Sequence, residues 1–173
     1  EAYPGHFLHY EHLRTVQSVV RKASFFSPVS FIEGWAHYCE QMMVEVGFRK
    51  EDPTIRLGQL AETLVRLARF IVAIRLHCED LSVEQGMRIF RDEAFQEEAA
   101  ARREAGRGTF DPMYLVYSVG KLALLKLRDD YKAQEGRKFS LRTFHDTLLQ
   151  QGTAPFWAHR QLMLDEPTGA ILE

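Results

Sequence analysis

The chain has 173 residues, of which 46% are hydrophobic and 27% are charged, and its formal net charge is −2. This length is enough for one domain with a buried core, and the charge balance excludes the basic surface of a nucleic-acid-binding protein. The apolar run at residues 70–74 is flanked by Arg69 and Arg75 and is too short to cross a membrane.

Helical spacing of apolar residues dominates the chain, and no stretch alternates in the manner of a strand. The expected helices cover residues 6–22, 31–46, 53–79, 83–90, 93–108, 112–131 and 141–150, with a short last helix after Pro155. Local signals support these boundaries: Asp52 precedes a proline, and Ser82 with Gln85 forms a capping box. The polar, Ala-rich segment 93–108 is expected to be a solvated helix. The sequence therefore predicts an all-α fold over residues 1–173, as one domain or part of one.

The first twelve residues, EAYPGHFLHYEH, gather three histidines and two glutamates. Zinc sites use three or four such ligands, and a common helical pattern is H-E-x-x-H, with the glutamate as general base. If a histidine preceded Glu1, it would lie six positions before His6, and residues six apart on a helix point about 120° away from each other. Pro4 and Gly5 supply the break that would let both reach one metal. The alternative is a loop that enters a helix, with its histidines on the surface.

A third ligand is suggested by the segment SFIEGWAHYCEQM. Glu33, His37 and Glu40 lie four and three positions apart, on one face of the expected helix. Carboxylates among so many aromatic residues are costly to bury without a partner, and one of them could complete a His-His-Glu zinc site. The alternative is a solvated charged face.

These two segments together resemble the bacterial family called domain of unknown function 885, which itself resembles the gluzincin zinc peptidases. The family pattern is H-E-A-Y-P-G-H followed by E-G-W-A-x-Y-x-E, and further similar blocks are DPTIRLGQL, IRLHCEDLSVEQGM, YSVGK and FHDTLLQQGTAPF. The similarity covers nearly the whole chain. It implies the C-terminal portion of a longer metallopeptidase-like domain, with the chain beginning inside the zinc motif.

The resemblance implies a role for each matching position. The residue before Glu1 is expected to be histidine and the first zinc ligand. Glu1 would be the general base, and His6 and Glu33 would be the second and third ligands. Glu40 is expected to support a ligand from outside the coordination sphere. The family usually has other residues where this chain has His9 and His37; each could be an extra ligand, a supporting donor or a surface residue, and the last two are favoured.

A zinc peptidase also needs a hydrogen-bond donor for the oxyanion of its tetrahedral intermediate. Tyr117 in YLVYSVGK and His145 in FHDTLLQQG are the candidates. The alternatives are a packed tyrosine with its hydroxyl at the rim, and a histidine paired with a nearby acid.

The sequence thus predicts a zinc-dependent, peptidase-like hydrolase that acts on a peptide or peptide-like substrate, with neither nucleic acid nor a membrane span involved. Other divalent ions would also suit a His-His-Glu site. The competing hypothesis is a non-catalytic helical module. Because the first ligand lies outside these residues, the isolated chain is expected to bind zinc weakly and to show little activity.

Overall fold

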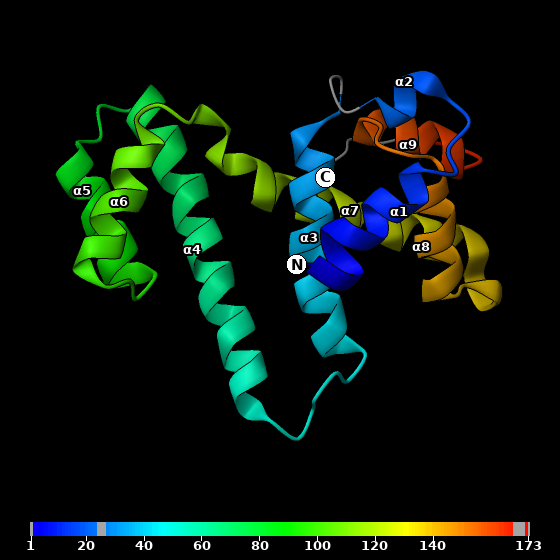
Figure 1. Ribbon diagram of the computed structural model, residues 1–173, viewed down its shortest axis with the longest axis horizontal. Coiled ribbons are helices and arrows are strands. Elements are labelled where there is room, and N and C mark those ends of the chain that lie inside the picture. Colours follow the sequence, from blue (N-terminus) through cyan, green and yellow to red (C-terminus); the bar gives the residue numbers. More distant parts are fainter. Residues whose placement is uncertain (1, 24–26, 168–171, 173) are drawn as a thin grey trace. The chain divides into compact units, whose positions relative to one another are not determined.

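The computed structural model describes residues 2–23, 27–167 and 172 of the chain, and these residues form helices and no strand (Figure 1). The all-α prediction is therefore confirmed. The α-helices are α1 (Phe7–Leu13), α2 (Val19–Lys22), α3 (Val29–Glu45), α4 (Pro53–Cys78), α5 (Val83–Arg88), α6 (Glu98–Gly108), α7 (Val116–Glu135), α8 (Leu141–Gln150) and α9 (Phe156–Met163). Short irregular helical segments lie at η1 (Ala2–His6), η3 (Ile89–Glu93), η4 (Pro112–Leu115) and η5 (Gly136–Lys138).

The predicted helix signals act as caps in the structure. The Asp52 carboxylate accepts a hydrogen bond from the backbone N–H of Thr54 at 3.1 Å, which satisfies one of the free donors at the start of α4. Ser82 and Gln85 form the complete capping box of α5. Gly47, which follows α3, has a φ of 87°, a left-handed conformation that glycine adopts without strain.

The prediction of one helix over residues 6–22 is wrong. Helix α1 ends at Leu13 and α2 begins at Val19. The hydroxyl of Thr15 donates to the carbonyl of His12 at 2.8 Å, and the hydroxyl of Ser18 caps α2 by accepting from the N–H of Arg21. These side chains offer the backbone local partners that compete with the helical ladder, so the chain turns between the two helices.

The Ala-rich segment 93–108 also differs from the prediction of a solvated helix. Helix α6 begins only at Glu98, and Phe95 before it has a φ of 53°. Ala101 and Ala105 are fully buried, in a cluster that includes Val72 of α4. The small side chains of these alanines allow close packing of one helix face, so α6 is amphipathic rather than solvated all round.

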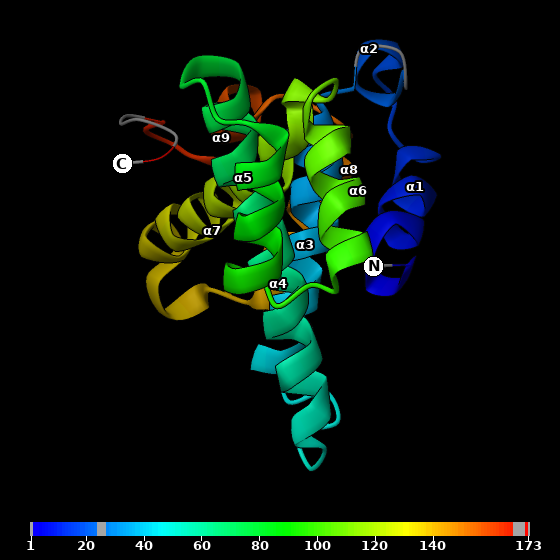
Figure 2. The ribbon, with the colours of Figure 1, turned by 90° about the vertical axis from the view of Figure 1, so that its left-hand side faces the viewer.

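Contacts divide the chain into two compact units. The first unit comprises residues 1–40 and 119–173, and the second comprises residues 41–118. In the second unit α5 and α6 pack together and α6 contacts α4 (Figure 2). The core of the second unit contains Val72, Phe90 and Ala101, each fully buried.

The core of the first unit is built from aromatic and aliphatic side chains of several helices. Its fully buried members include Phe31, Trp35, Tyr38, Leu124 and Leu148. Helix α1 contacts α8, and α8 contacts α9. This aromatic core directly supports the N-terminal segment that carries the predicted zinc motif.

No helix in the described part of the chain combines the length and the apolar character that crossing a bilayer would require. The expectation that the chain contains no membrane span agrees with this finding.

Candidate functional site

The backbone leaves the helical path within the predicted zinc motif. Tyr3 is extended, with φ −132° and ψ 125°, and Gly5 has ψ −122°. Helical angles resume at His6, where φ is −54° and ψ is −42°, and α1 follows. The break predicted at Pro4 and Gly5 is therefore confirmed. Glu1, the predicted general base, lies outside the described residues.

The break brings His6 opposite Glu33 of α3. The Nε2 atom of His6 lies 3.7 Å from the Oε2 atom of Glu33. The two side chains are 31% and 28% exposed, so the pair is open to solvent on one side. The Nδ1 atom of His6 is buried and has no hydrogen-bond partner within the described residues. The structure thus joins two of the predicted zinc ligands, which are far apart in the sequence.

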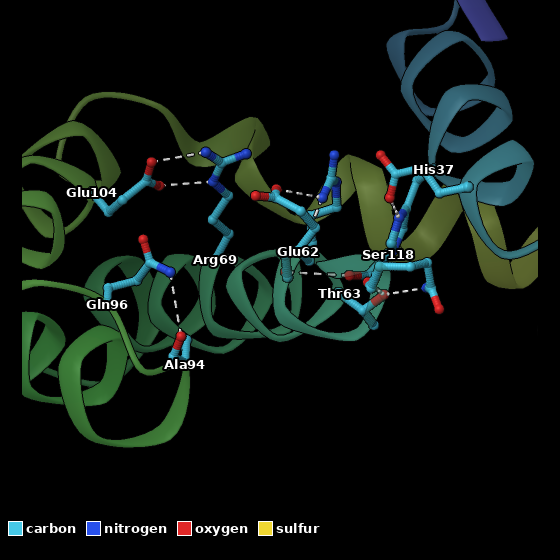
Figure 3. A network of polar contacts seen from close by, with 11 residues as sticks. His37, Glu62, Thr63, Arg69, Ala94, Gln96, Glu104 and Ser118 are labelled. Atoms are coloured by element: carbon cyan, nitrogen blue, oxygen red, sulfur yellow. Dashed lines mark hydrogen bonds and ion pairs between the residues drawn. The ribbon is translucent and has the colours of Figure 1, made fainter. Parts of the chain in front are cut away.

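His37 and Glu40, the predicted supporting residues, contact each other. The Nδ1 atom of His37 lies 3.2 Å from the Oε2 atom of Glu40 (Figure 3). The His37 side chain is only 2% exposed, so the alternative of a surface residue is wrong for it. That Glu40 supports a metal ligand stays a prediction.

His9 is also buried rather than on the surface. Its Nε2 atom lies 2.9 Å from the hydroxyl of Thr153, and its ring makes an edge contact with Phe31. Burial, and next the nearby charge of His6, lower the pKa of His9 to about 4. His9 is therefore neutral at pH 7 and ties α1 to the segment that precedes α9.

His145 of α8, one of the predicted oxyanion donors, lies under the aromatic residues of α3. Its Nε2 atom is 2.8 Å from the hydroxyl of Tyr38, and its ring meets the ring of Trp35 edge-on at 5.3 Å. A guanidinium N–H of Arg128 donates to the same hydroxyl at 3.4 Å. Which of Nε2 and the hydroxyl is the donor depends on the tautomer of the imidazole.

This environment keeps His145 neutral. Burial, and next the positive charge of Arg128, lower the pKa of His145 to about 4. The alternative of a histidine paired with an acid is not what the structure shows for Nε2, whose partner is a tyrosine hydroxyl. A neutral imidazole can donate one hydrogen bond, from whichever of its ring nitrogens carries the proton.

Tyr117, the other predicted oxyanion donor, belongs to the second unit, whereas His6, Glu33 and His145 belong to the first. The guanidinium of Arg69 lies over the Tyr117 ring, 5.4 Å from its centre. Arg69 in turn makes two hydrogen bonds to the carboxylate of Glu104, at 2.7 and 2.8 Å (Figure 3). Burial opposes ionisation of Glu104, but the hydrogen bonds and charge of Arg69 outweigh it and hold the pKa of Glu104 below its usual value. The Tyr117 ring is thus packed against a fixed cation.

Trp35, which contacts the motif, and Tyr38, which contacts His145, were not predicted as part of the site. The indole N–H of Trp35 donates to the carbonyls of Pro4 and Gly5, and Tyr38 holds His145. The signal was present in EGWAHYCE, where two aromatic residues lie between two acidic ones. Local spacing could not show which of these aromatic side chains would reach the break at Pro4.

A family model described as "Bacterial protein of unknown function (DUF885)" matches residues 1–163 of the chain. Two solved structures are similar. One is "a putative lipoprotein of unknown function from Shewanella oneidensis", with a TM-score of 0.88 and 32% identity over 95% of this chain. The other is "the putative lipoprotein from Colwellia psychrerythraea", with a TM-score of 0.88 and 30% identity over 94% of this chain. This chain covers 30% and 28% of those two chains. No curated protein matches it.

Proposed function

We propose that this chain, which belongs to the DUF885 family of bacterial proteins, carries part of the catalytic site of a zinc-dependent hydrolase that cleaves peptide or related amide bonds. The observation that supports the proposal most is the approach of His6 to Glu33, with 3.7 Å between the imidazole Nε2 and the carboxylate Oε2. This pair forms across a break in the helix that the peptidase motif requires.

The separation of these two atoms suits a shared zinc ion. Zinc lies about 2.0–2.2 Å from nitrogen and oxygen ligands, so two ligand atoms of a tetrahedral site are about 3.4 Å apart. Within the described ranges, no group of three His, Cys, Asp or Glu side chains is placed to hold a metal. The proposal therefore requires a further ligand, and we propose a histidine before Glu1 for this role.

In this proposal His6 and Glu33 hold the metal, and their partial exposure leaves room for a substrate. A bound zinc ion supplies a water molecule whose pKa is lowered towards neutrality. The carboxylate of Glu1 would accept the proton of the attacking water as general base. The imidazole N–H of His145 or the hydroxyl of Tyr117 would donate a hydrogen bond to the substrate oxygen on which negative charge develops.

The test is hydrolysis of a peptide library by the full-length protein, before and after treatment with a metal chelator. We expect cleavage that the chelator abolishes and that added zinc restores. Glu1→Gln should keep the bound zinc but lose activity by several orders of magnitude, because it removes only the base. Zinc-bound protein that cleaves no peptide or amide would contradict the proposal and favour the non-catalytic helical module.

A further inference from the structure

We infer that Trp35 is the positioning residue that fixes the break at Pro4 and Gly5 and so places His6 opposite Glu33. The inference rests on the proposed function, because it concerns the same two metal ligands, His6 and Glu33. It adds the residue that fixes their relative position. Trp35 contacts the backbone of the motif and not the metal-binding atoms, so its effect is exerted through His6.

The indole of Trp35 is bound to both carbonyls of the break. Its Nε1–H donates to the oxygen of Pro4 at 3.2 Å and to the oxygen of Gly5 at 3.0 Å. The thiol of Cys39, one turn further along α3, also donates to the Pro4 oxygen, at 3.7 Å. Backbone that departs from helical angles needs other partners for its polar groups, and here α3 supplies them. The carbonyl directions that precede His6 are thereby fixed.

Helix α3 contacts the break at Ala36 and also through the residues on either side of Ala36. Gly5 is buried against Ala36, where a Cβ atom added to Gly5 would lie 3.6 Å from the Ala36 backbone. Successive residues of a helix are rotated by about 100°, so Glu33 and Trp35 lie on opposite flanks of Ala36. Trp35 on one flank donates to the carbonyls before His6, and Glu33 on the other flank approaches the His6 ring. A shift of the segment on α3 would therefore disturb both contacts together.

Trp35 itself has little freedom to move. It is fully buried, its ring meets the ring of His145 at 87°, and it lies beside the ring of Tyr38 at 5.8 Å. A hydrogen bond between Tyr38 and His145 completes this cluster, and Arg128 donates to the same hydroxyl. Support of this kind keeps a metal ligand in one orientation, and its loss typically weakens metal binding about 10–100-fold.

The experiment compares Trp35→Phe with Trp157→Phe in the full-length protein. The first change keeps an aromatic ring but removes the only indole N–H that reaches Pro4 and Gly5 within the described residues. The second makes the same chemical change at a side chain of α9 that is 57% exposed. Zinc affinity is measured by competition with a chromophoric chelator, and the visible spectrum of the Co²⁺-substituted protein reports the ligand geometry.

We expect Trp35→Phe to weaken zinc binding by about 10–100-fold and to alter the Co²⁺ spectrum, with Trp157→Phe unchanged in both. A folded Trp35→Phe protein with wild-type zinc affinity and Co²⁺ spectrum would overturn the inference while leaving the proposed function intact. If wild-type protein binds no zinc, the proposed function itself fails. Should Trp35→Phe not fold, replacement of Trp35 by the isosteric 3-benzothienylalanine, which has sulfur in place of the indole N–H, decides: a several-fold loss of zinc affinity supports the inference, and wild-type affinity overturns it.

Discussion

The hydroxyl of Tyr38 links a cation to a neutral imidazole. It accepts a hydrogen bond from Arg128 and lies 2.8 Å from the Nε2 atom of His145. The charge of Arg128 acts through this contact and, together with burial, keeps the imidazole neutral. A neutral His145 is suited to donate a hydrogen bond and unsuited to act as an acid near pH 7.

We expect His145→Gln to lower kcat by about 100-fold at saturating zinc, because removal of one oxyanion donor typically has an effect of this size. Since the pKa of His145 is about 4, we expect its protonation to make no contribution to the pH dependence of activity between pH 7 and pH 5. Steady-state kinetics across this pH range measure both effects. An unchanged kcat in the variant would remove His145 from the list of oxyanion donors.

The second donor candidate is tested by Tyr117→Phe. This change removes the hydroxyl but keeps the ring over which Arg69 lies, so the thermal unfolding midpoint should change little. If the hydroxyl is the oxyanion donor, kcat falls by about 100-fold while zinc content stays the same. A variant with normal kcat would show that Tyr117 is a packed residue, which was the alternative from the sequence.

The burial of two histidines predicts that the folded protein loses stability in acid. His9 and His159 both contact the ring of Phe31, and the imidazole nitrogens of His159 have no hydrogen-bond partner within the described residues. Burial, followed by the neighbouring His9, lowers the pKa of His159 to about 3, while the unfolded chain keeps the ordinary value of 6.5. The unfolded state therefore binds protons first as the pH falls. The contribution of His159 to stability is complete above pH 6.5 and is lost progressively below it.

We expect His159→Phe to reduce the slope of unfolding free energy against pH between pH 6.5 and 4.5, where one such histidine contributes about 2–3 kcal/mol. Chemical denaturation at several pH values measures the slope. Equal slopes in wild type and His159→Phe would refute the assignment.

A close contact between α3 and α7 predicts that Gly120 cannot be replaced without a loss of stability. A Cβ atom on Gly120 of α7 would lie 1.9 Å from the carbonyl oxygen of Ser30 and 2.8 Å from the Cα of Gly34. Both neighbours are backbone atoms that cannot turn aside. Gly120→Ala should therefore destabilise the protein by about 1–3 kcal/mol or more.

The control for this change is Gly58→Ala in α4, where an added Cβ atom meets nothing within 4 Å. Alanine is the better helix former, so this variant should gain about 0.5–1 kcal/mol. Urea unfolding of both variants gives the comparison. Equal stabilities would show that α3 and α7 do not approach each other as closely as the structure indicates.

Local signals in the sequence predicted much of the fold. Asp52, Ser82 and Ser140 cap helices where expected, because each cap depends only on residues two or three positions away. The burial of Ala101 was not predictable in this way, since it depends on a partner helix that no local pattern identifies.

In the candidate site, too, the local features were predictable from the sequence and the tertiary contacts were not. The break at Pro4 and Gly5 follows from the properties of proline and glycine, and the nearness of His6 to Glu33 followed from the expected ligand chemistry. The cluster of Trp35 with His145 joins residues more than a hundred positions apart and is created by the tertiary packing of α3 and α8. Sequence spacing carries no information on such a contact.

The most direct test of the proposed metal site is zinc per molecule in the full-length protein as isolated, beside Glu33→Gln and Glu11→Gln. Glu33 faces His6, whereas Glu11 is on the exposed side of α1 next to Arg14. We predict about one zinc in wild type and in Glu11→Gln, and a marked loss in Glu33→Gln. Absence of zinc from wild type, or zinc retained at the same affinity by Glu33→Gln, would contradict the account.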